Sequence, residues 1–461
     1  MRKFIIILSI IVAGFSLFGQ DISGDWNGLS HFKNGILKIV FHIQKTDSGY
    51  MATWDSPYQA VYGHAVDTVV FENGQLTLIC NESHFKYKGA LNKKDEIDGI
   101  FSQWEQVPLY LSQKKITRPQ EPKKPYPYME EVKFDNPVAP GVTLAGTLTL
   151  PERHKGQCSA VILVSGSGQQ NRDEEIFEHK PFLVIADYLT RRGIAVLRYD
   201  DRGVFGSTGN PDTCTAYDFS LDAEAAFNYL KTRKEINPQQ IGIIGHSEGG
   251  IIAPMVAARN KEVAFTVLLA APGIRGDSLM YLQRKLLMQL LNLSKRQIDA
   301  ILAYRSKHDS LIVHIDEPEQ RNEELADFIT DVVNKQMPKA VQEEKNRAIE
   351  LELQIVTLQS YQYLIRYNPA IALSKVQCPV LALNGDKDFQ VSAAENLNGV
   401  QQALLKSGNR RVTIQKLPGL NHLFQMSKTG SISEYPQIEE TFSPKVLKIM
   451  EKWIKAVTKQ K

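Results

Sequence analysis

A short segment in the middle of the chain joins two different kinds of apolar run through a glycine-rich turn. The run Ile241–Ile244 is typical of a buried strand, and Gly250–Ala258 is typical of a helix. Between them stands Gly245-His246-Ser247-Glu248-Gly249, which matches the pattern G-x-S-x-G. The flanking glycines let the backbone pass close to strand and helix, and the serine then lies at a helix N-terminus. The segment predicts a sharp strand–turn–helix with Ser247 at its tip.

Strand-like and helix-like segments of this kind continue over the C-terminal two thirds of the chain. Apolar runs of strand length alternate with amphipathic stretches of helix length, an order that predicts a mostly parallel sheet flanked by helices, the α/β class. The expected elements are strands at 160–164, 194–199, 241–244, 380–383 and 412–417, and helices at 181–190, 218–230, 393–405 and 446–457. Residues 276–369 break the alternation with helical periodicity alone, as in the row Leu279, Leu282, Leu286 and Leu290. We expect an inserted helical cap there.

Residues 20–112 have period two instead. Leu37, Ile39, Phe41 and Ile43 alternate with other residues, as in a half-buried strand. Asn-Gly pairs at 34–35 and 73–74 predict hairpin turns, because both residues tolerate positive φ. The pattern predicts a small antiparallel β domain, which resembles lipocalin-like modules. Residues 113–127 are rich in lysine and proline and predict an extended linker before a domain at 128–461.

The first residues have the pattern of a secretory signal peptide. Arg2 and Lys3 precede an apolar stretch from Phe4 to Leu17, and small residues lead to a polar start at Gln20. We expect residues 1–19 to be removed and the mature chain to be exported, periplasmic or secreted, without stable membrane insertion. An uncleaved membrane anchor is the alternative.

Length and composition narrow the remaining possibilities. The 461 residues exceed the roughly 250–300 at which single cores stop growing, so two folded units are expected. A net charge of +3 without a basic, aromatic-interleaved patch gives no reason to expect nucleic acid as a partner. The cysteines have no zinc-site spacing and are expected to be buried thiols: Cys80, Cys158, Cys214 and Cys378.

Several motifs together resemble the α/β-hydrolases, specifically exported carboxylesterases of the serine-aminopeptidase-like branch. Besides the G-x-S-x-G segment, the resemblance rests on motifs spread between residues 128 and 461: Gly166-Ser167-Gly168, Asp201-Arg202-Gly203, Asn384-Gly385-Asp386-Lys387-Asp388, Leu420-Asn421-His422 and the C-terminal block from Glu434 to Trp453. It implies the α/β-hydrolase fold with Ser247 as the nucleophile and no metal or organic cofactor. Phe205 stands where the family's D-x-R-G-x-G-x-S loop has its second glycine, so the conformation of this loop is open.

In this fold the catalytic residues follow in the order serine, acid, histidine. Three histidines follow Ser247, and only His422 lies in a loop after a late strand, since His308 and His314 fall in the expected cap. Asp386 and Asp388 both follow the strand at 380–383. The resemblance selects Asp388, three residues after the glycine, and leaves Asp386 to serve the turn.

The oxyanion hole requires two backbone N–H groups. The residue after the nucleophile, Glu248, is expected to give one. The loop after the strand that ends at Val164 is expected to give the other, and the resemblance points to Ser167, with Gln169 as the reserve. Arg202 is assigned a structural role beside carboxylates near the site.

The expected reaction is hydrolysis of small or short-chain carboxylic esters through an acyl-enzyme, with a small-molecule ester as the partner. An aminopeptidase or amidase of the same fold is the alternative, because acidic residues of the cap could bind an α-amine: Glu317, Glu319, Glu323, Glu324, Glu343 and Glu344. A third hypothesis is a non-catalytic binding protein that works through its β domain. In that case the serine would not react with a fluorophosphonate.

Overall fold

The computed structural model describes residues 21–32, 35–59, 61–114, 116–123, 126, 128–152, 156–291 and 293–459. The predicted signal peptide at 1–19 and Asn34 of the first predicted turn lie outside this set. The chain divides into two compact units, Met1–Ile116 and Thr117–Lys461. Among the described residues, no helix is both long and apolar enough to span a bilayer.

The first unit is a nine-stranded antiparallel sheet in the order β4-β3-β2-β1-β9-β8-β7-β6-β5. β3 and β5, from near opposite ends of this order, contact each other, so the sheet is a nearly closed barrel. The strands are β1 (Gly24–Phe32), β2 (Gly35–Thr46), β3 (Gly49–Ser56), β4 (Val61–Val66), β5 (Thr68–Glu72), β6 (Gln75–Cys80), β7 (Phe85–Leu91), β8 (Glu96–Ser102) and β9 (Gln106–Ser112), with a 3₁₀ turn η1 (Pro57–Gln59).

Alternate residues of these strands fill the barrel interior. On β2, Ile39, Phe41 and Ile43 are buried, as their period-two spacing predicted. Tyr87 is fully buried, and its hydroxyl donates to the carbonyl oxygens of Ile97 and Leu109. The predicted turn between β5 and β6 is confirmed, with positive φ at Asn73 and Gly74. Aromatic and aliphatic side chains therefore make the interior a packed core.

The second unit contains an eight-stranded sheet in the order β10-β11-β13-β12-β14-β15-β16-β17. The pairings β10–β11 and β11–β13 are antiparallel, and all the others are parallel. The strands are β10 (Met129–Asp135), β11 (Thr143–Thr149), β12 (Cys158–Val164), β13 (Ile194–Tyr199), β14 (Ile236–His246), β15 (Phe265–Leu269), β16 (Val380–Gly385) and β17 (Val412–Leu417). The predicted α/β class is confirmed.

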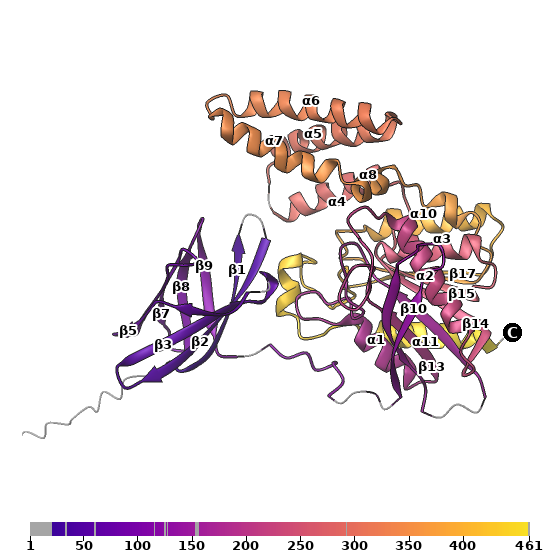
Figure 1. Cartoon of the computed structure of the whole chain (residues 1–461), viewed down its shortest axis with the longest axis horizontal. Coiled ribbons are helices and arrows are strands. Elements are labelled where there is room, and N and C mark those ends of the chain that lie inside the picture. The colour runs from indigo at the N-terminus through magenta and orange to yellow at the C-terminus, as the bar shows by residue number, and fades with distance from the viewer. Residues whose placement is uncertain are drawn as a thin grey trace, which may run out of the picture. The chain divides into compact units, whose positions relative to one another are not determined.

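Helices cover both faces of this sheet (Figure 1). On β12, Ala160, Ile162 and Val164 face one hydrophobic core, while Val161 and Leu163 face the other. One core is closed by α2 (Ala216–Lys231), α3 (Gly249–Arg259), α9 (Ala370–Leu373) and α10 (Ala393–Lys406). The other is closed by α1 (Pro181–Thr190) and α11 (Pro444–Lys459). The strands β12, β13, β15 and β16 are thus buried on both sides, which explains their continuous apolar runs, whereas the edge strand β17 is partly exposed.

The predicted cap is wholly helical and follows β15. Its helices are α4 (Gly276–Leu290), α5 (Lys295–His314), α6 (Pro318–Gln336), α7 (Gln342–Val356) and α8 (Gln359–Arg366). Leu325 and Ile329 of α6 are fully buried in the cap's own small core, together with Ile312 and Val356. The chain then returns through α9 to β16.

The predicted linker is partly held by the second unit. The Arg118 guanidinium donates to the carbonyl oxygens of Phe177, Pro436 and Ile438. The Gln120 side-chain amide bonds to the backbone of Thr441 and Phe442. These bonds anchor residues 118–120 beside the 3₁₀ helix η2 (Ile432–Gln437) and the loop that precedes α11. Cys80, Cys158 and Cys214 are buried, as predicted, whereas Cys378 is only half-buried.

Candidate active site

Ser247 occupies a strained turn between β14 and α3. Its φ is +51°, in the left-handed region that non-glycine residues rarely adopt. The neighbouring glycines make this turn possible, because a Cβ at Gly245 would lie 1.9 Å from the carbonyl oxygen of Gly249. A Cβ at Gly249 would lie 2.1 Å from the carbonyl oxygen of Val164. The structure therefore places the serine at the tip of the predicted sharp turn, just before the N-terminus of α3.

His422 and Asp388 meet Ser247 from the ends of two other strands. Ser247 Oγ is 3.1 Å from His422 Nε2, and His422 Nδ1 is 2.8 Å from Asp388 Oδ2. Asp388 follows β16 and His422 follows β17, so parallel strands bring residues 34 positions apart together at one sheet edge. Both side chains are buried, which favours the charge-assisted hydrogen bond between them.

The two candidate aspartates have different surroundings. Asp388 Oδ1 accepts from the backbone N–H groups of Gln390 and Val391, both at 2.9 Å, which leaves Oδ2 for His422. Asp386 Oδ1 instead accepts from the backbone N–H of Gly419 at 2.7 Å. The structure therefore brings Asp388 to the histidine and uses Asp386 as a turn acceptor.

The loop that follows β12 lies against the serine. A Cβ added to Gly166 would be 3.1 Å from Ser247 Cβ, so this glycine permits close approach. Ser167, the predicted donor of this loop, and Gln169, its reserve, follow in the same loop with exposed side chains. Glu248, the other predicted donor, is the N-cap residue of α3. Both segments expected to form an oxyanion hole therefore border Ser247.

The Arg202 side chain is bound to a buried carboxylate. Its guanidinium donates to both oxygens of Asp222, at 2.8 and 2.7 Å, as its expected structural role requires. Phe205, the departure from the family pattern, has φ +46° and an 80% exposed side chain. This loop therefore adopts its bend without the glycine, with the phenyl ring in solvent.

A buried ion pair behind Ser247 was not predicted. Glu174 and His246 are 4% and 6% exposed, and Glu174 Oε1 is 2.9 Å from His246 Nδ1. The same oxygen accepts the Gly166 N–H at 2.7 Å, and His246 Nε2 donates to the carbonyl oxygen of His422 at 2.9 Å. One pair thus ties together the loop after β12, the turn of Ser247 and the loop of His422. The available signal was the histidine inside the G-x-S-x-G motif; nothing in the sequence marked Glu174.

The pKa values near this pair are shifted. Burial alone would lower the pKa of His246, but the Glu174 carboxylate and the His422 carbonyl raise it above its ordinary value. Burial raises the pKa of Glu248 to about 7. Burial, together with the charges of Glu174 and Glu248, also raises the pKa of Asp201 to about 7, although Ser165 Oγ donates to it. Among the described residues, no cluster of three or more metal-ligating side chains is present.

Comparison with known proteins agrees with this architecture. The family model described as "Serine aminopeptidase, S33" matches residues 178–428, which include Ser247, Asp388 and His422. Esterase EstD of Thermotoga maritima is 26% identical over 408 residues, covering 88% of this chain and 79% of EstD. The putative hydrolase YtaP of Bacillus subtilis is 28% identical over 137 residues, covering 26% of this chain and 46% of YtaP.

Among solved structures, a Pyrococcus furiosus esterase, Pf2001, is 15% identical with a TM-score of 0.43, covering 72% of this chain and 91% of its own. Because the family model spans more than half of the chain and the sheet has the α/β-hydrolase order, the assignment is plain. The chain is a hydrolase that belongs to the serine aminopeptidase S33 family of α/β-hydrolases.

Proposed function

We propose that this protein hydrolyses carboxylic esters of small or short-chain acyl groups, with Ser247 as the nucleophile. The observation that carries the proposal is the continuous chain of contacts from Ser247 Oγ through His422 to Asp388, at 3.1 and 2.8 Å. A serine hydroxyl is weakly nucleophilic by itself and is activated by an adjacent base that a third group orients.

The proposed reaction has two acyl-transfer steps. His422 Nε2 takes the proton of Ser247 Oγ as this oxygen attacks the ester carbonyl carbon. The oxyanion then accepts from the backbone N–H groups of Glu248 and Ser167. The imidazolium returns the proton to the leaving alcohol, and an acyl-serine remains. Water, deprotonated by His422, attacks the acyl-serine; the acyl–oxygen bond breaks, the imidazolium returns its proton to Ser247 Oγ, and the acid is released.

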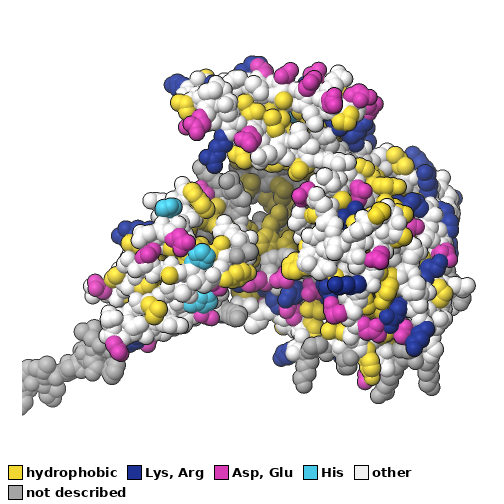
Figure 2. Space-filling view, in the orientation of Figure 1, with side chains coloured by type: hydrophobic (Ala, Val, Ile, Leu, Met, Phe, Trp, Pro, Cys, Tyr) yellow, Lys and Arg dark blue, Asp and Glu magenta, His cyan; other side chains and the backbone are white. Residues whose placement is uncertain are grey.

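Two considerations favour esters over peptides. The curated relative that spans most of the chain is named an esterase. The six cap glutamates that could have bound an α-amine are all exposed in the structure. Figure 2 shows acidic side chains spread over the outer surface of the cap helices. Exposed carboxylates give little binding energy to an ammonium group, because water screens them.

The test is the loss of both activity and labelling in Ser247→Ala. We expect turnover of p-nitrophenyl acetate to fall by roughly 10⁶-fold while the protein stays folded. The wild type should react with a fluorophosphonate probe and the variant should not. Ser48→Ala, in the exposed turn between β2 and β3, is the matched control and should behave as wild type. Near-normal hydrolysis or labelling by Ser247→Ala would exclude Ser247 as the nucleophile.

The second experiment compares substrates. Acyl p-nitrophenyl esters of increasing chain length and aminoacyl anilides are given to the same preparation. A higher kcat/KM for short esters supports the proposal. A preference for aminoacyl anilides would establish the aminopeptidase alternative instead.

A further inference from the structure

A pocket of about 540 Å³ opens between helices of the second unit, away from the proposed catalytic residues. Its walls come from α2, α3, α8 and the segment through α9, and neither Ser247, Asp388 nor His422 lines it. We propose that this pocket binds an amphipathic carboxylate, an organic acid whose anionic head is attached to an apolar chain. Its volume lies within the range of pockets that bind small molecules.

The interior of the pocket suits an apolar chain. Met255 and Ala258 of α3 form one wall, and Tyr363 and Tyr367 form the opposite wall with their rings stacked at 5.7 Å and 23°. Ile371 borders the opening with 60% of its side chain exposed. Large apolar side chains exposed together around a concavity mark a binding surface.

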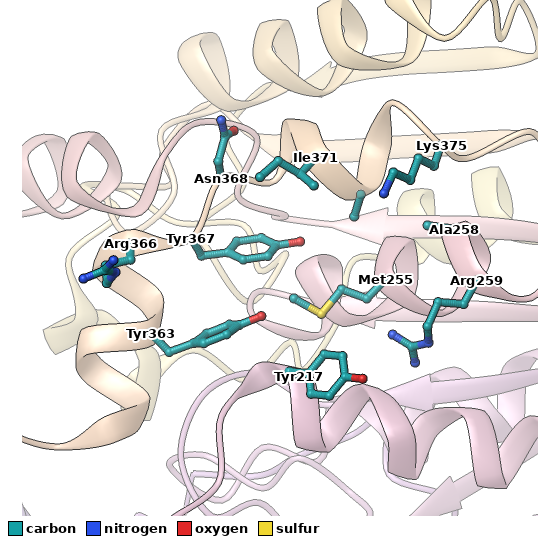
Figure 3. Close-up of a pocket in the computed structure, with 11 residues that line it drawn as sticks. Tyr217, Met255, Ala258, Arg259, Tyr363, Arg366, Tyr367, Asn368, Ile371 and Lys375 are labelled. Carbon is teal, nitrogen blue, oxygen red and sulfur yellow. The ribbon is translucent and has the colours of Figure 1, made fainter. Parts of the chain in front are cut away.

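A hydrogen-bond donor in the wall of the pocket has no acceptor. The Tyr367 hydroxyl is buried, and no described group forms a hydrogen bond with it. Figure 3 shows the hydroxyls of Tyr363 and Tyr367 both pointing inward, toward the side of the pocket where Met255 lies. Buried polar groups are nearly always hydrogen-bonded, so an unpaired phenol that lines a pocket calls for a ligand acceptor.

The charged side chains at the opening of the pocket favour a negatively charged ligand. The lining includes Arg259, Arg366 and Lys375 and no acidic residue. Arg259 pairs with Glu224 and Arg366 pairs with Asp316, whereas no described carboxylate pairs with Lys375. The Lys375 ammonium points toward the pocket (Figure 3). A carboxylate that accepts from the Lys375 ammonium and the Tyr367 hydroxyl, with its apolar chain against Met255, would use each of these features.

The experiment measures binding of sodium octanoate to the full chain by isothermal titration calorimetry, with 1-octanol, octylammonium and acetate as comparison ligands. We expect one octanoate per chain, about tenfold weaker binding of octanol, and no binding of octylammonium or acetate. Equal affinity for octanol and octanoate would overturn the choice of an anion. Absence of octanoate binding would overturn the site.

Three variants locate the ligand. Lys375→Glu should weaken octanoate binding by about tenfold, equivalent to about 1.4 kcal/mol, while Lys445→Glu, an exposed lysine on α11, should leave it unchanged. Tyr367→Phe should weaken binding without lowering Tm, since its hydroxyl loses no partner. Ala258→Phe fills the pocket and should abolish binding. Unchanged affinity in Lys375→Glu and Ala258→Phe would place octanoate elsewhere, including the Ser247 site, and would refute the proposal.

Discussion

Replacing Glu174 by glutamine tests the buried pair that ties three loops of the site together. The carboxylate oxygen Oε1 serves both the Gly166 N–H at 2.7 Å and His246 Nδ1 at 2.9 Å. His246 Nε2 faces a carbonyl oxygen, which can only accept, so this nitrogen must carry a proton. Both ring nitrogens therefore face acceptors, and the geometry favours the imidazolium.

Glutamine cannot satisfy all three bonds without leaving a buried positive charge uncompensated. If the amide oxygen still accepts from the Gly166 N–H, it can also accept from His246 only when Nδ1 is protonated. The imidazolium that results no longer has a negative charge beside it. If its NH₂ group turns to a neutral His246 Nδ1, the Gly166 N–H loses its acceptor. Leaving one buried group unpaired costs about 1–3 kcal/mol. Glu174→Ala leaves the buried cation without its partner and should cost about 3–5 kcal/mol.

The cost should depend on pH in a defined direction. The pKa of His246 is raised in the folded protein above its ordinary value of 6.5. The pair therefore stabilises the fold fully below pH 6.5, and this contribution is lost as pH rises through the folded pKa. The difference in unfolding free energy between wild type and Glu174→Gln should be largest in mildly acidic buffer and should shrink at alkaline pH.

The assay is urea unfolding at several pH values together with kcat and KM for p-nitrophenyl acetate. Because the pair positions the loop of His422 and the loop of Gly166, kcat should fall by up to about 10²-fold with little change in KM. Glu175→Gln, an exposed neighbour, is the control. The reasoning fails if Glu174→Gln matches wild type in stability, or if its stability deficit is the same at every pH.

Two further predictions concern carboxylates of the site. Asp388→Asn should lower kcat by about 10⁴-fold with the fold retained. The amide oxygen can keep the hydrogen bonds from the Gln390 and Val391 N–H groups, but the NH₂ group forces the wrong tautomer on His422. Asp386→Asn is the control, and equal activities of the two variants would contradict this role. Glu248→Gln should stabilise the protein above pH 7 by at most about 3 kcal/mol and have no effect near pH 4. The pKa of Glu248 rises from 4.5 to about 7 on folding, so between these pH values only the unfolded chain ionises and the wild type loses stability, a loss that is complete above pH 7. Denaturant unfolding at both pH values measures this, and a variant that is less stable at alkaline pH would be evidence against it.

The strands and helices of the hydrolase unit were predictable where apolar residues form a continuous run or recur with a regular spacing. The helix at 181–190 and the strands at 194–199 and 412–417 have the predicted bounds. Burial on both faces makes the apolar run of β13 continuous, whereas β17, at the edge of the sheet, is fully buried only at Leu417. β10, β11 and β15 were not predicted. β10 and β11 form the antiparallel edge of the sheet, where burial is uneven along β10, and β15 is only five residues long.

The catalytic candidates were predictable for a different reason. The glycines beside Ser247 are required because a Cβ at Gly245 would lie 1.9 Å from a backbone oxygen. The motif therefore predicts the shape of the turn without knowledge of the rest of the fold. His422 and Asp388 follow strands, and strand order alone brings them together. Glu174 lies in a loop between β12 and α1 with no periodicity, and its partner is 72 residues away. Only the folded chain reveals that Glu174 and His246 are neighbours.

The site's rigidity follows from where its polar and apolar contacts lie. Behind Ser247, backbone approaches at Gly245 and Gly249 leave no room for side chains, and the Glu174–His246 pair forms hydrogen bonds that join separate loops. Left-handed φ at Ser247 costs free energy that this surrounding structure must offset. Substitutions behind the serine should therefore act on catalysis and stability together, whereas the pocket beside Met255, on the second half of α3, borders none of these contacts and can differ without disturbing the nucleophile.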